Sequence, residues 1–281
     1  PPCVSPPFPR GDTGGLPPCV SPPFPRGDTG GLPPAILFQG SPLPPIDVII
    51  CRPNFVEEPS LHTHTPNLLA QAGYQVINSG SAIAVAKNKI TQHVLFDQHH
   101  LPCPRWGIAH QSEDALAIAQ RIGFPVILKV AFGTQGKGVF YAPSPETLQP
   151  IAQYLAVRDH NPIIVEEFIE EAGRKDLRVF LLGGEVVASM QRTAPDGDVR
   201  ANASNGGMGT PVKLREEERE LAQRTANLFK LDIAGVDIIR SHRGSLLLEV
   251  NANPGFKELE GVTGQDIADA IIQYALNSQP L

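Results

Sequence analysis

The sequence of 281 residues contains few cysteines and no long apolar run. Its four cysteines show no CxxC spacing and no accompanying histidine pair, which predicts neither a disulfide framework nor a zinc site. No apolar stretch approaches the roughly 20 residues that cross a bilayer, so we expect no membrane partner. There is also no basic stretch followed by an apolar run and a cleavage site. A cytoplasmic location is therefore expected.

The chain also lacks an excess of positive charge and the Walker spacing GxxxxGK[ST]. Its net charge is -6, which gives no electrostatic reason to expect a nucleic-acid partner. The absence of the Walker spacing excludes a P-loop. What remains is ordinary for a globular protein, with 41% apolar and 19% charged residues. This composition is sufficient for a sizeable core.

The first 32 residues are an internal duplication. Residues 1–16 (PPCVSPPFPRGDTGGL) recur without change as residues 17–32. Proline fixes φ and removes an amide donor, so the prolines of each copy exclude a regular helix or a central strand. Each copy also offers little apolar surface to offset the entropy of ordering. We therefore expect residues 1–45 to form a disordered tail; a Pro-rich interaction arm is the alternative.

From Ile46 onwards the pattern changes to alternating helices and strands. Strands at 46–50 and 74–78 flank a helix at 65–73, which predicts a small strand–helix–strand unit. Further helices are predicted at 86–99, 112–123, 145–159, 215–232 and 264–276, with Ser112 as an N-cap. Strands are predicted around the loop in 125–142, at 163–169, and as two hairpins, 176–192 and 235–253. This irregular alternation around hairpins favours an α+β fold.

The last hairpin carries the clearest chemical signal. Glu249 and Asn251 lie two residues apart on one strand, so they share a face, and a turn near Arg243 places Asp237 opposite Glu249. Opposed carboxylates destabilise a sheet unless a cation lies between them. Two carboxylates and an amide oxygen are ligands that magnesium prefers. The alternative is a pair of solvated surface acids, but the strongly apolar neighbours favour a metal site.

A second signal is Lys129, which lies within the apolar stretch PVILKV and precedes FGTQGKGV. A lysine in an apolar strand needs an anionic partner. The glycines that follow it, Gly133, Gly136 and Gly138, allow backbone amides to approach phosphates closely. Together these features predict a nucleotide-binding clamp.

Arginines on the strands give a third signal. Asp176 and Arg178 share a face by the period of two, Arg192 ends the next strand, and Arg200 and Asn202 follow in DVRANASNGG. Surface arginines are usually only solvated. Several of them near a Gly-Gly pair, however, suggest a pocket for phosphate or carboxylate, which guanidinium groups bind in a bidentate manner.

Taken together, residues 46–281 resemble the ATP-grasp superfamily, and in particular the RimK-type α-L-glutamate ligases. The stretches that carry the resemblance stand in the order of that family: NSGSAIAVAKNK, LKVAFGTQGKGV, KDLRVFLLGGEVVASMQR, DVRANASNGG and AGVDIIR…LLLEVNANPG. The resemblance implies an ATP-grasp fold with three parts after the tail. These are a shortened N-terminal α/β domain (46–85), a central lid subdomain (86–166) and a C-terminal subdomain with the metal site (167–281).

The resemblance also implies roles for single residues. Lys89 and Lys129 would contact ATP phosphates beneath a lid formed by Gly133, Thr134, Gln135, Gly136 and Gly138. Glu167 and Phe168 would lie at the adenine, Asp176 on the ribose side, and Arg200 and Asn202 at the nucleotide or acyl phosphate. Arg178 would also bind the nucleotide. Asp237, Glu249 and Asn251 would hold two magnesium ions, with manganese as the alternative. Arg192 would stabilise an oxyanion, and Lys129 and Arg200 would join it in catalysis.

The implied activity is that of an ATP-dependent ligase forming a C–N bond. It would join an amino acid, glutamate first, to a carboxylate of a small molecule, a peptide or a protein C-terminus, through an acyl phosphate and with release of ADP. Relatives are often homo-oligomers. The repeat and PPAILFQGSPLPP stand where family members usually carry a longer N-terminal domain, and Asn253 stands where many have Ser or Thr. The alternatives are a ligase that closes peptide rings or glutamylates a cofactor, and an ATP-binding protein with impaired catalysis.

Overall fold

The computed structural model describes residues 36–52, 62–132, 138–158, 161–195 and 208–277. They belong to one compact unit, Pro34–Leu281. Disorder of residues 1–35 stays a prediction, because these residues lie outside the described part. Residues 36–45 differ from the prediction, since Leu37–Phe38 (β1) and Ser41–Pro42 (β2) pair as a short antiparallel hairpin. The predicted tail is therefore too long at its C-terminal end.

The predicted strand–helix–strand unit is present, with shorter strands than expected. Ile49–Ile50 (β3) pairs in parallel with Val76–Ile77 (β4), and His64–Gln71 (α1) lies between them in the chain. Ile77 is fully buried, with Ile50 packed against the same apolar cluster. Burial on both faces is typical of parallel strands and explains the continuous apolar run.

The helix predicted at 86–99 is present but starts three residues later, and a further helix that was not predicted precedes it. Gly80–Lys87 (α2) is capped by Ser79, whose Oγ accepts from the Ala82 amide at 3.2 Å. Lys89–Gln98 (α3) starts anew after Asn88, whose Oδ1 accepts from the amides of Ile90 and Thr91 at 3.0 and 3.1 Å. An asparagine that satisfies the first free amides of a helix favours an extended backbone at its own position. This cap separates the two helices.

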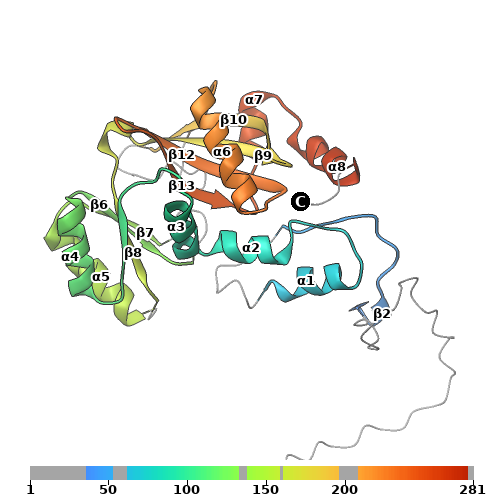
Figure 1. Ribbon diagram of the computed structural model, residues 1–281, viewed down its shortest axis with the longest axis horizontal. Coiled ribbons are helices and arrows are strands. Elements are labelled where there is room, and N and C mark those ends of the chain that lie inside the picture. Colours follow the sequence, from blue (N-terminus) through green and yellow to red (C-terminus); the bar gives the residue numbers. More distant parts are fainter. Residues whose placement is uncertain (1–35, 53–61, 133–137, 159–160, 196–207, 278–281) are drawn as a thin grey trace, which may run out of the picture. The chain divides into compact units, whose positions relative to one another are not determined.

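A four-stranded antiparallel sheet forms the smaller layer, with the strand order β5-β8-β6-β7. Two helices pack on one face of it (Figure 1). The first has Gln111 as its N-cap rather than the predicted Ser112, which lies buried in the first turn. Strand β5 was not predicted. The elements are Trp106–Ala109 (β5), Ser112–Ile122 (α4), Val126–Val130 (β6), Val139–Ala142 (β7), Pro145–Arg158 (α5) and Ile163–Glu167 (β8).

Alternation along β6 and β8 divides this sheet into two faces. Val126, Leu128 and Val165 pack against α4 and α5. Successive side chains of a strand point to opposite faces, so Lys129 and Glu166 lie on the face away from those helices. In the register, Glu166 lies opposite Ile127, two residues from Lys129. The chain thus places a lysine and a glutamate diagonally on one face of the smaller sheet.

A five-stranded antiparallel sheet forms the larger layer, with the strand order β11-β10-β9-β12-β13. Both predicted hairpins occur in it, β9 with β10 and β12 with β13. Strand β11 and the short 3-10 helix before β9 were not predicted. These elements are Glu170–Ala172 (η2), Lys175–Leu182 (β9), Glu185–Thr193 (β10), Met208–Pro211 (β11), Ile233–Ser241 (β12) and Gly244–Asn251 (β13).

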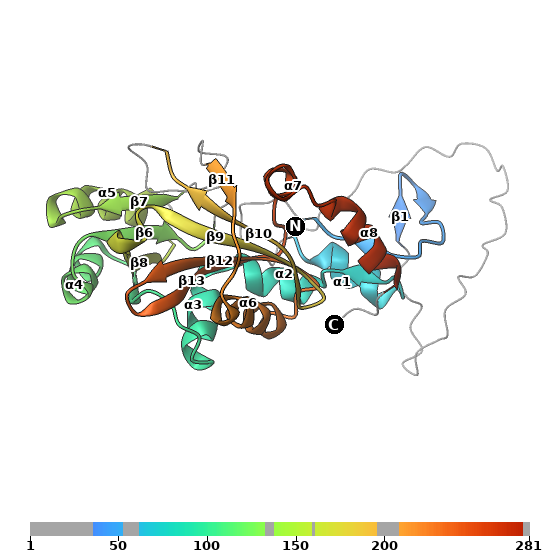
Figure 2. The ribbon, with the colours of Figure 1, turned by 90° about the horizontal axis from the view of Figure 1, so that it is seen from above.

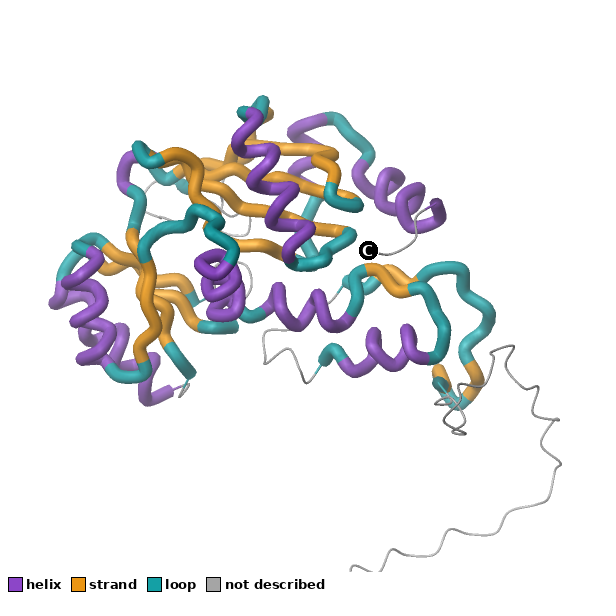
Figure 3. The backbone as a smooth tube through the Cα atoms, in the orientation of Figure 1, coloured by secondary structure: helices purple, strands orange, loops and turns teal. Residues whose placement is uncertain are grey.

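Helices cover both faces of the larger sheet (Figures 2 and 3). Glu216–Leu228 (α6) packs on one face together with α2 and α3. Lys257–Thr263 (α7), which was not predicted, and Ile267–Asn277 (α8) pack on the other face, against Phe180 and Ile233. Within the described part of the chain, no helix combines the length and the apolar composition needed to cross a membrane.

Helix α3 belongs to the core of the larger sheet. Phe96 is fully buried there, and its ring lies 5.9 Å from that of Phe229. The sequence predicted a subdomain boundary at residue 86, which would assign α3 to the smaller layer. This boundary stays a prediction; the packing shows only that α3 contributes to the core of the larger sheet.

Candidate active site

The hairpin of β12 and β13 brings the predicted metal ligands together. Asp237 lies directly opposite Glu249, and Gly235 lies opposite Asn251. The register shifts after Asp237, since Ile238 pairs with Leu247. Val250 is buried in the core beneath α2, α3 and α6, so Glu249 and Asn251 share the other face of the sheet. The predicted pairing of the two acids across the hairpin is confirmed.

Two arginines hold the carboxylate of Asp237. Arg178 donates to it in a bidentate manner, Nε to Oδ1 at 2.6 Å and Nη2 to Oδ2 at 2.9 Å. Arg192 lies 3.1 Å from the same Oδ2 and also binds Asp176 in a bidentate manner at 2.7 and 2.8 Å. These four side chains are buried, and they come from neighbouring positions of β9, β10 and β12. They form a network of alternating charge on one face of the sheet.

The electrostatics of this network keep Asp237 and Arg192 charged at neutral pH. Burial raises the pKa of Asp237 to about 6, with Glu249 and Asp176 acting in the same direction against Arg178 and Arg192. Burial alone would lower the pKa of Arg192, but Asp237 and Asp176 raise it above its ordinary value. Asp237 therefore enters any metal site as a carboxylate that is already paired.

Glu249 lies in a different environment. Its Oε1 accepts from Asn251 Nδ2 at 3.2 Å, and its Oε2 lies 3.8 Å from Lys89 Nζ. Burial would raise the pKa of Glu249, but the charges of Lys89, Lys129 and Arg178 lower it to about 2. The side chain is 27% exposed, against 3% for Asp237. Glu249 is therefore the more accessible of the two acids for a ligand that arrives from solvent.

The donor set suits a hard divalent cation. Asp237 and Glu249 face each other, and Asn251 adds an amide whose oxygen takes no part in its bond to Glu249. Among the residues that the structure describes, there is no group of three or more His, Cys, Asp or Glu suited to a metal. A magnesium ion at this hairpin would thus complete its shell with water and phosphate oxygens, as magnesium commonly does.

Lys129 has the anionic partner that its burial demands, but this partner was not predicted. Its Nζ donates to Glu166 Oε1 at 2.6 Å. The second oxygen of Glu166 lies 2.7 Å from His93 Nε2, and His93 Nδ1 lies 2.8 Å from the carbonyl oxygen of Lys89. Burial would raise the pKa of Glu166, whereas Lys129 and His93 lower it below its ordinary value. These three residues connect β6, β8 and α3.

Helix α3 brings the second predicted lysine to the acids. The amide of Lys89 donates to the carbonyl of Ala131, just after β6, at 3.1 Å. Its Nζ faces Glu249 on β13. Both Lys89 and Lys129 lower the pKa of Glu249, so both positive charges act on this carboxylate. The structure thus gathers Lys89, Lys129, Glu249 and Asn251, and places Asp237 beside them.

The predicted adenine residues lie at the end of β8. The Glu167 carboxylate accepts from Arg105 Nη2 at 2.8 Å and also pairs with Arg243 of the β12–β13 turn. Burial would raise the pKa of Glu167, but the bonds to Arg105 and Arg243 lower it. The Phe168 ring packs edge-on against Tyr141 at 5.0 Å. The Glu167 side chain therefore links the smaller sheet to the tip of the hairpin of the larger one.

Only the end of the predicted lid is described. Gly138 has a φ of +83°, and a Cβ there would lie 2.3 Å from Val130 Cγ2, so no other residue fits without rearrangement. Its carbonyl accepts from the Val130 amide at 3.0 Å. The other predicted lid residues lie outside the described residues, as do Arg200 and Asn202. These lid residues are Gly133, Thr134, Gln135 and Gly136.

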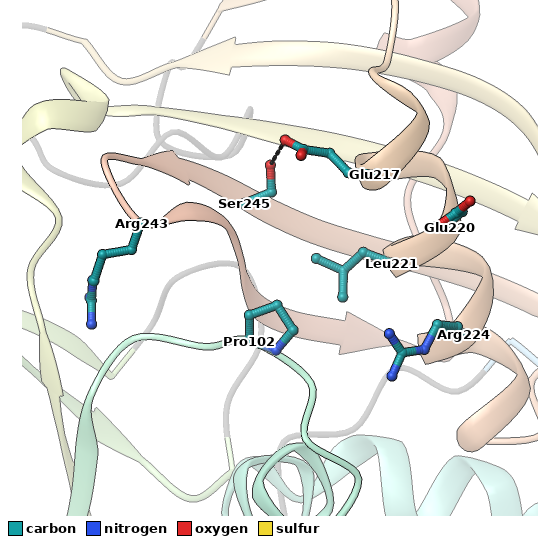
Figure 4. A pocket seen from close by; sticks show the side chains of 7 residues that line it. All are labelled: Pro102, Glu217, Glu220, Leu221, Arg224, Arg243 and Ser245. Carbon is teal, nitrogen blue, oxygen red and sulfur yellow. Dashed lines mark hydrogen bonds between the residues drawn. The ribbon is translucent and has the colours of Figure 1, made fainter.

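A pocket of about 280 Å³ lies elsewhere, between α6 and the β12–β13 turn (Figure 4). Ser245 donates to Glu217 across it at 3.4 Å. None of the predicted site residues lines it. Its lining is Pro102, Glu217, Glu220, Leu221, Arg224, Arg243 and Ser245.

Three residues near the acids were missed by sequence reasoning. Glu166 carried a usable signal. A buried lysine requires an anion, and Glu166 is an acid at the end of an otherwise apolar strand. His93 carried no such signal in an ordinary helix. Gln92 was missed too: its Oε1 accepts from the Val250 amide at 2.9 Å and its Nε2 donates to the Val250 carbonyl at 3.0 Å. It thereby pairs with the free edge of β13, between Glu249 and Asn251.

Comparison with known proteins gives the class first. The fold matches the crystal structure of a RimK domain protein ATP-grasp from Sphaerobacter thermophilus DSM 20745, with a TM-score of 0.68 and 19% identity over 86% of each chain. It also matches the ATP-grasp ligase PsnB complexed with minimal precursor, Mg and ADP, with a TM-score of 0.59 and 22% identity over 77% of this chain and 67% of that one. The chain has an ATP-grasp fold.

The family follows from the sequence. Residues 86–275 match the RimK-like ATP-grasp domain. The chain is 42% identical over 202 residues to a probable alpha-L-glutamate ligase of Parasynechococcus marenigrum (strain WH8102), covering 72% of this chain and 43% of that protein. It therefore spans less than half the length of that relative, and about two thirds of several others. This chain belongs to the RimK-like ATP-grasp family.

Proposed function

We propose that this chain is an ATP- and magnesium-dependent carboxylate–amine ligase that adds glutamate to a carboxylate acceptor. The observation that carries the proposal is the pair of opposed acids, Asp237 and Glu249, with Lys89 Nζ 3.8 Å from the Glu249 carboxylate. The charge of Lys129 also acts on Glu249 and lowers its pKa. Paired acids with lysines nearby are suited to binding magnesium and a polyphosphate. This chemistry requires no nucleophilic side chain. The names of curated relatives supply the choice of glutamate.

The first chemical step would transfer the γ-phosphoryl group. An oxygen of the acceptor carboxylate attacks the γ-phosphorus, the bond from that phosphorus to the bridging oxygen breaks, and ADP leaves with the electron pair. Asp237, Glu249 and Asn251 would hold magnesium, which supplies charge neutralisation for the transferring group. Lys89 and Lys129 would fix the phosphates from the other side. The product of this step is an acyl phosphate.

The second step would form the amide. The amino nitrogen of glutamate attacks the acyl carbon, the C–N bond forms, the bond to the phosphate oxygen breaks, and phosphate leaves as the amine loses a proton to solvent. Arg192 would stabilise the oxyanion of the tetrahedral intermediate from within its network with Asp176 and Asp237. Arg200 and Asn202 are proposed at the acyl phosphate, and Glu167 and Phe168 at the adenine, with Asp176 on its ribose side. Arg178 is proposed as a further contact to the nucleotide.

A second candidate is ligation on a peptide acceptor, including closure of a side-chain ring. It is supported by the likeness to PsnB, whose complex contains a minimal precursor. The two candidates share the acyl phosphate and differ in the amine. Mass spectrometry distinguishes them, because ring closure loses water from the peptide whereas ligation adds an amino acid.

The proposal predicts the products of ATP. With a carboxylate acceptor and glutamate, the protein should form ADP and phosphate in proportion to the amide, because the cationic side chains and the metal ligands address the terminal phosphoryl group. Omitting glutamate should leave only slow ADP release. Chromatography of the nucleotides is the measurement, and stoichiometric AMP would mean an adenylating enzyme.

The matched variants are Lys129→Met and Glu113→Gln. Lys129→Met removes a cation that faces the acids and should reduce ADP formation about 100-fold or more. Glu113 is an exposed residue of α4, and its variant should retain the parent rate. Equal rates for both variants would contradict the proposed role of Lys129.

A further inference from the structure

Helix α3 and the smaller sheet enclose a chain of three ionisable side chains, of which the proposed reaction uses only Lys129 directly. His93 and Glu166 are 1% exposed and Lys129 is 9% exposed. His93 Nε2 and Glu166 Oε2 are 2.7 Å apart, and Lys129 Nζ donates to Glu166 Oε1 at 2.6 Å. The His93 ring packs between aromatic side chains, with centroid distances of 4.8 Å to Trp106 and 5.8 Å to Phe96.

The two contacts of the His93 ring determine how many protons the chain holds. Nδ1 faces the carbonyl oxygen of Lys89 at 2.8 Å, and a carbonyl oxygen can only accept. Nε2 faces a carboxylate oxygen, which also only accepts when Glu166 is ionised. Both ring nitrogens must therefore donate. A neutral imidazole would leave a lone pair directed at one of these two oxygens in a buried place.

The geometry points to His93 and Glu166 as positioning residues for Lys129: His93, held as an imidazolium, balances the Glu166 carboxylate, which can then orient the Lys129 ammonium without cancelling its charge. This inference rests on the proposed function, in which Lys129 faces phosphates. With all three side chains ionised, the set carries one net positive charge. If His93 were neutral, the ion pair of Lys129 with Glu166 would have no net charge to offer an anion.

The same arrangement also links the two lysines. Lys89 offers its carbonyl oxygen to His93, and its Nζ faces Glu249. One imidazole thus fixes the backbone that carries Lys89 and the carboxylate that orients Lys129. Because α3 packs with the larger sheet while β6 and β8 belong to the smaller one, His93 holds the lysines of both layers in register.

The proton of His93 makes nucleotide affinity depend on pH. Above the pH at which the imidazole loses its proton, the net charge facing the phosphates disappears, and affinity for ADP should fall as pH rises. Burial raises the pKa of the Cys103 thiol to about 12, so this thiol stays neutral where histidines usually lose their proton. The His93 ring itself contacts the Lys89 backbone of α3 and the Glu166 carboxylate of β8. The charged and titratable groups one contact further away are Lys129 of β6, bound to Glu166, and Asp97 of α3, bound to Trp106 and Cys103.

Glu166→Gln is the most informative variant. The Gln oxygen can still accept from Lys129, and its NH₂ can donate to the Nε2 lone pair of a neutral His93 that keeps its Nδ1–H bond to Lys89. Every hydrogen bond is preserved, as is the single net positive charge, now on Lys129 alone. The variant should therefore bind ADP within about twofold of the parent at about pH 6, with an affinity that no longer depends on His93.

His93→Leu has the opposite effect and can be rescued. It removes the imidazolium and leaves Glu166 to neutralise Lys129. The affinity for ADP should therefore fall about tenfold, which corresponds to about 1.4 kcal/mol of binding free energy. The double variant with Glu166→Gln restores the net charge and should recover most of that loss. A purely structural role for His93 predicts no recovery, because the second substitution adds nothing to the packing.

The first measurement needs no nucleotide. Imidazole ¹⁵N NMR of the ligand-free protein, with His93 assigned from the spectrum of His93→Leu, should show both ring nitrogens protonated in the parent at about pH 7 and only Nδ1 protonated in Glu166→Gln. The second is calorimetry of ADP with magnesium from about pH 6 to about pH 9, with Glu113→Gln as the control. Because ADP itself titrates, the ratio of parent to Glu166→Gln affinity at each pH is the relevant quantity.

A neutral His93 in the parent, or parallel pH curves for the parent and Glu166→Gln, would overturn the inference. If His93→Leu does not fold, the NMR assignment can use His93→Gln, and the pH comparison still decides. Failure of the proposed function would be seen differently, as absence of amine-dependent ADP formation by a parent protein whose His93 is nevertheless an imidazolium.

Discussion

Asp237 and Glu249 face each other across one hairpin, yet their partners differ. Asp237 is buried between Arg178 and Arg192, whereas Glu249 is partly exposed beside Lys89. Removing a charge at these two positions should therefore have different consequences, although the sequence alone treats both residues as equivalent metal ligands.

Glu249→Gln should separate catalysis from folding. The substitution keeps the shape and the bond from Asn251 but removes a ligand charge, so magnesium-dependent ADP formation should fall about 100-fold or more. The free energy of unfolding in denaturant should stay within about 1 kcal/mol of the parent value, since the side chain is partly exposed.

By contrast, Asp237→Asn leaves two buried guanidinium groups with one carboxylate less and should lower the free energy of unfolding by about 3 kcal/mol. Full activity of both variants would exclude the hairpin as the metal site.

Glu218 gives a pH prediction that does not involve the proposed site. It is fully buried, accepts from Arg240 Nε and Nη2 at 2.6 and 2.9 Å, and caps α6 through the Arg215 amide at 2.9 Å. Burial would raise its pKa, but these partners lower it below the ordinary value of 4.5. Its contribution to stability is thus present above about pH 4.5 and is lost as pH falls through the lower folded value. Glu218→Gln should be less stable at pH 7 and lose less on acidification, as followed by denaturant midpoints at several pH values.

At the scale of elements, β13 is an edge strand that one side chain completes. Gln92 of α3 presents a donor and an acceptor to Val250, as a neighbouring strand would. Gln92→Leu leaves the amide and the carbonyl of Val250 without this partner, which should cost about 3 kcal/mol and weaken magnesium binding by the flanking ligands. Hydrogen exchange at the Val250 amide and isothermal titration with magnesium and ADP are the measurements. The matched control is Gln120→Leu on the exposed side of α4; similar losses in both variants would contradict this role.

The elements also show what can be predicted from the sequence. The hairpin of β9 and β10 followed from its strand patterns and its Gly183–Gly184 turn. The hairpin of β12 and β13, and with it the pairing of Asp237 with Glu249, followed from a turn near Arg243. The break between α2 and α3 was missed, because Asn88 in an otherwise helical stretch reads as a tolerated polar residue until its cap bonds are seen. Strands β5 and β11 carry four residues each and little periodicity, so only pairing with longer strands defines them.

The site was predictable in part for the same physical reason. Acids on strands can be assigned to a face by counting, which placed Asp176 with Arg178 and Glu249 with Asn251. Partners from different elements cannot be counted in this way. That Lys129 would find Glu166, and Glu166 would find His93, depends on the packing of α3 against the smaller sheet.

At the scale of the whole molecule, the duplicated N-terminal segment should be dispensable for stability. The segment is a Pro-rich repeat and has no core-forming pattern. Deleting residues 1–33 should change the free energy of unfolding by less than about 1 kcal/mol. Chemical denaturation of the full and shortened chains is the comparison, and a clear loss of cooperativity would show that the segment packs on the rest.

A buried amide side chain reinforces the packing of the strand–helix–strand unit on the larger sheet. Asn78 donates to the carbonyls of Ile233 and Ala252 at 2.8 and 3.0 Å and accepts from the Ile233 amide at 2.9 Å. These bonds connect the end of β4 to the start of β12 and to the residue after Asn251. For the evolution of such a chain, these bonds allow the strand–helix–strand unit before Asn78 and the larger sheet to change separately. Segments ahead of Asn78 can lengthen, shorten or be exchanged to meet new acceptors, while the strands that carry Asp237 and Glu249 keep their places.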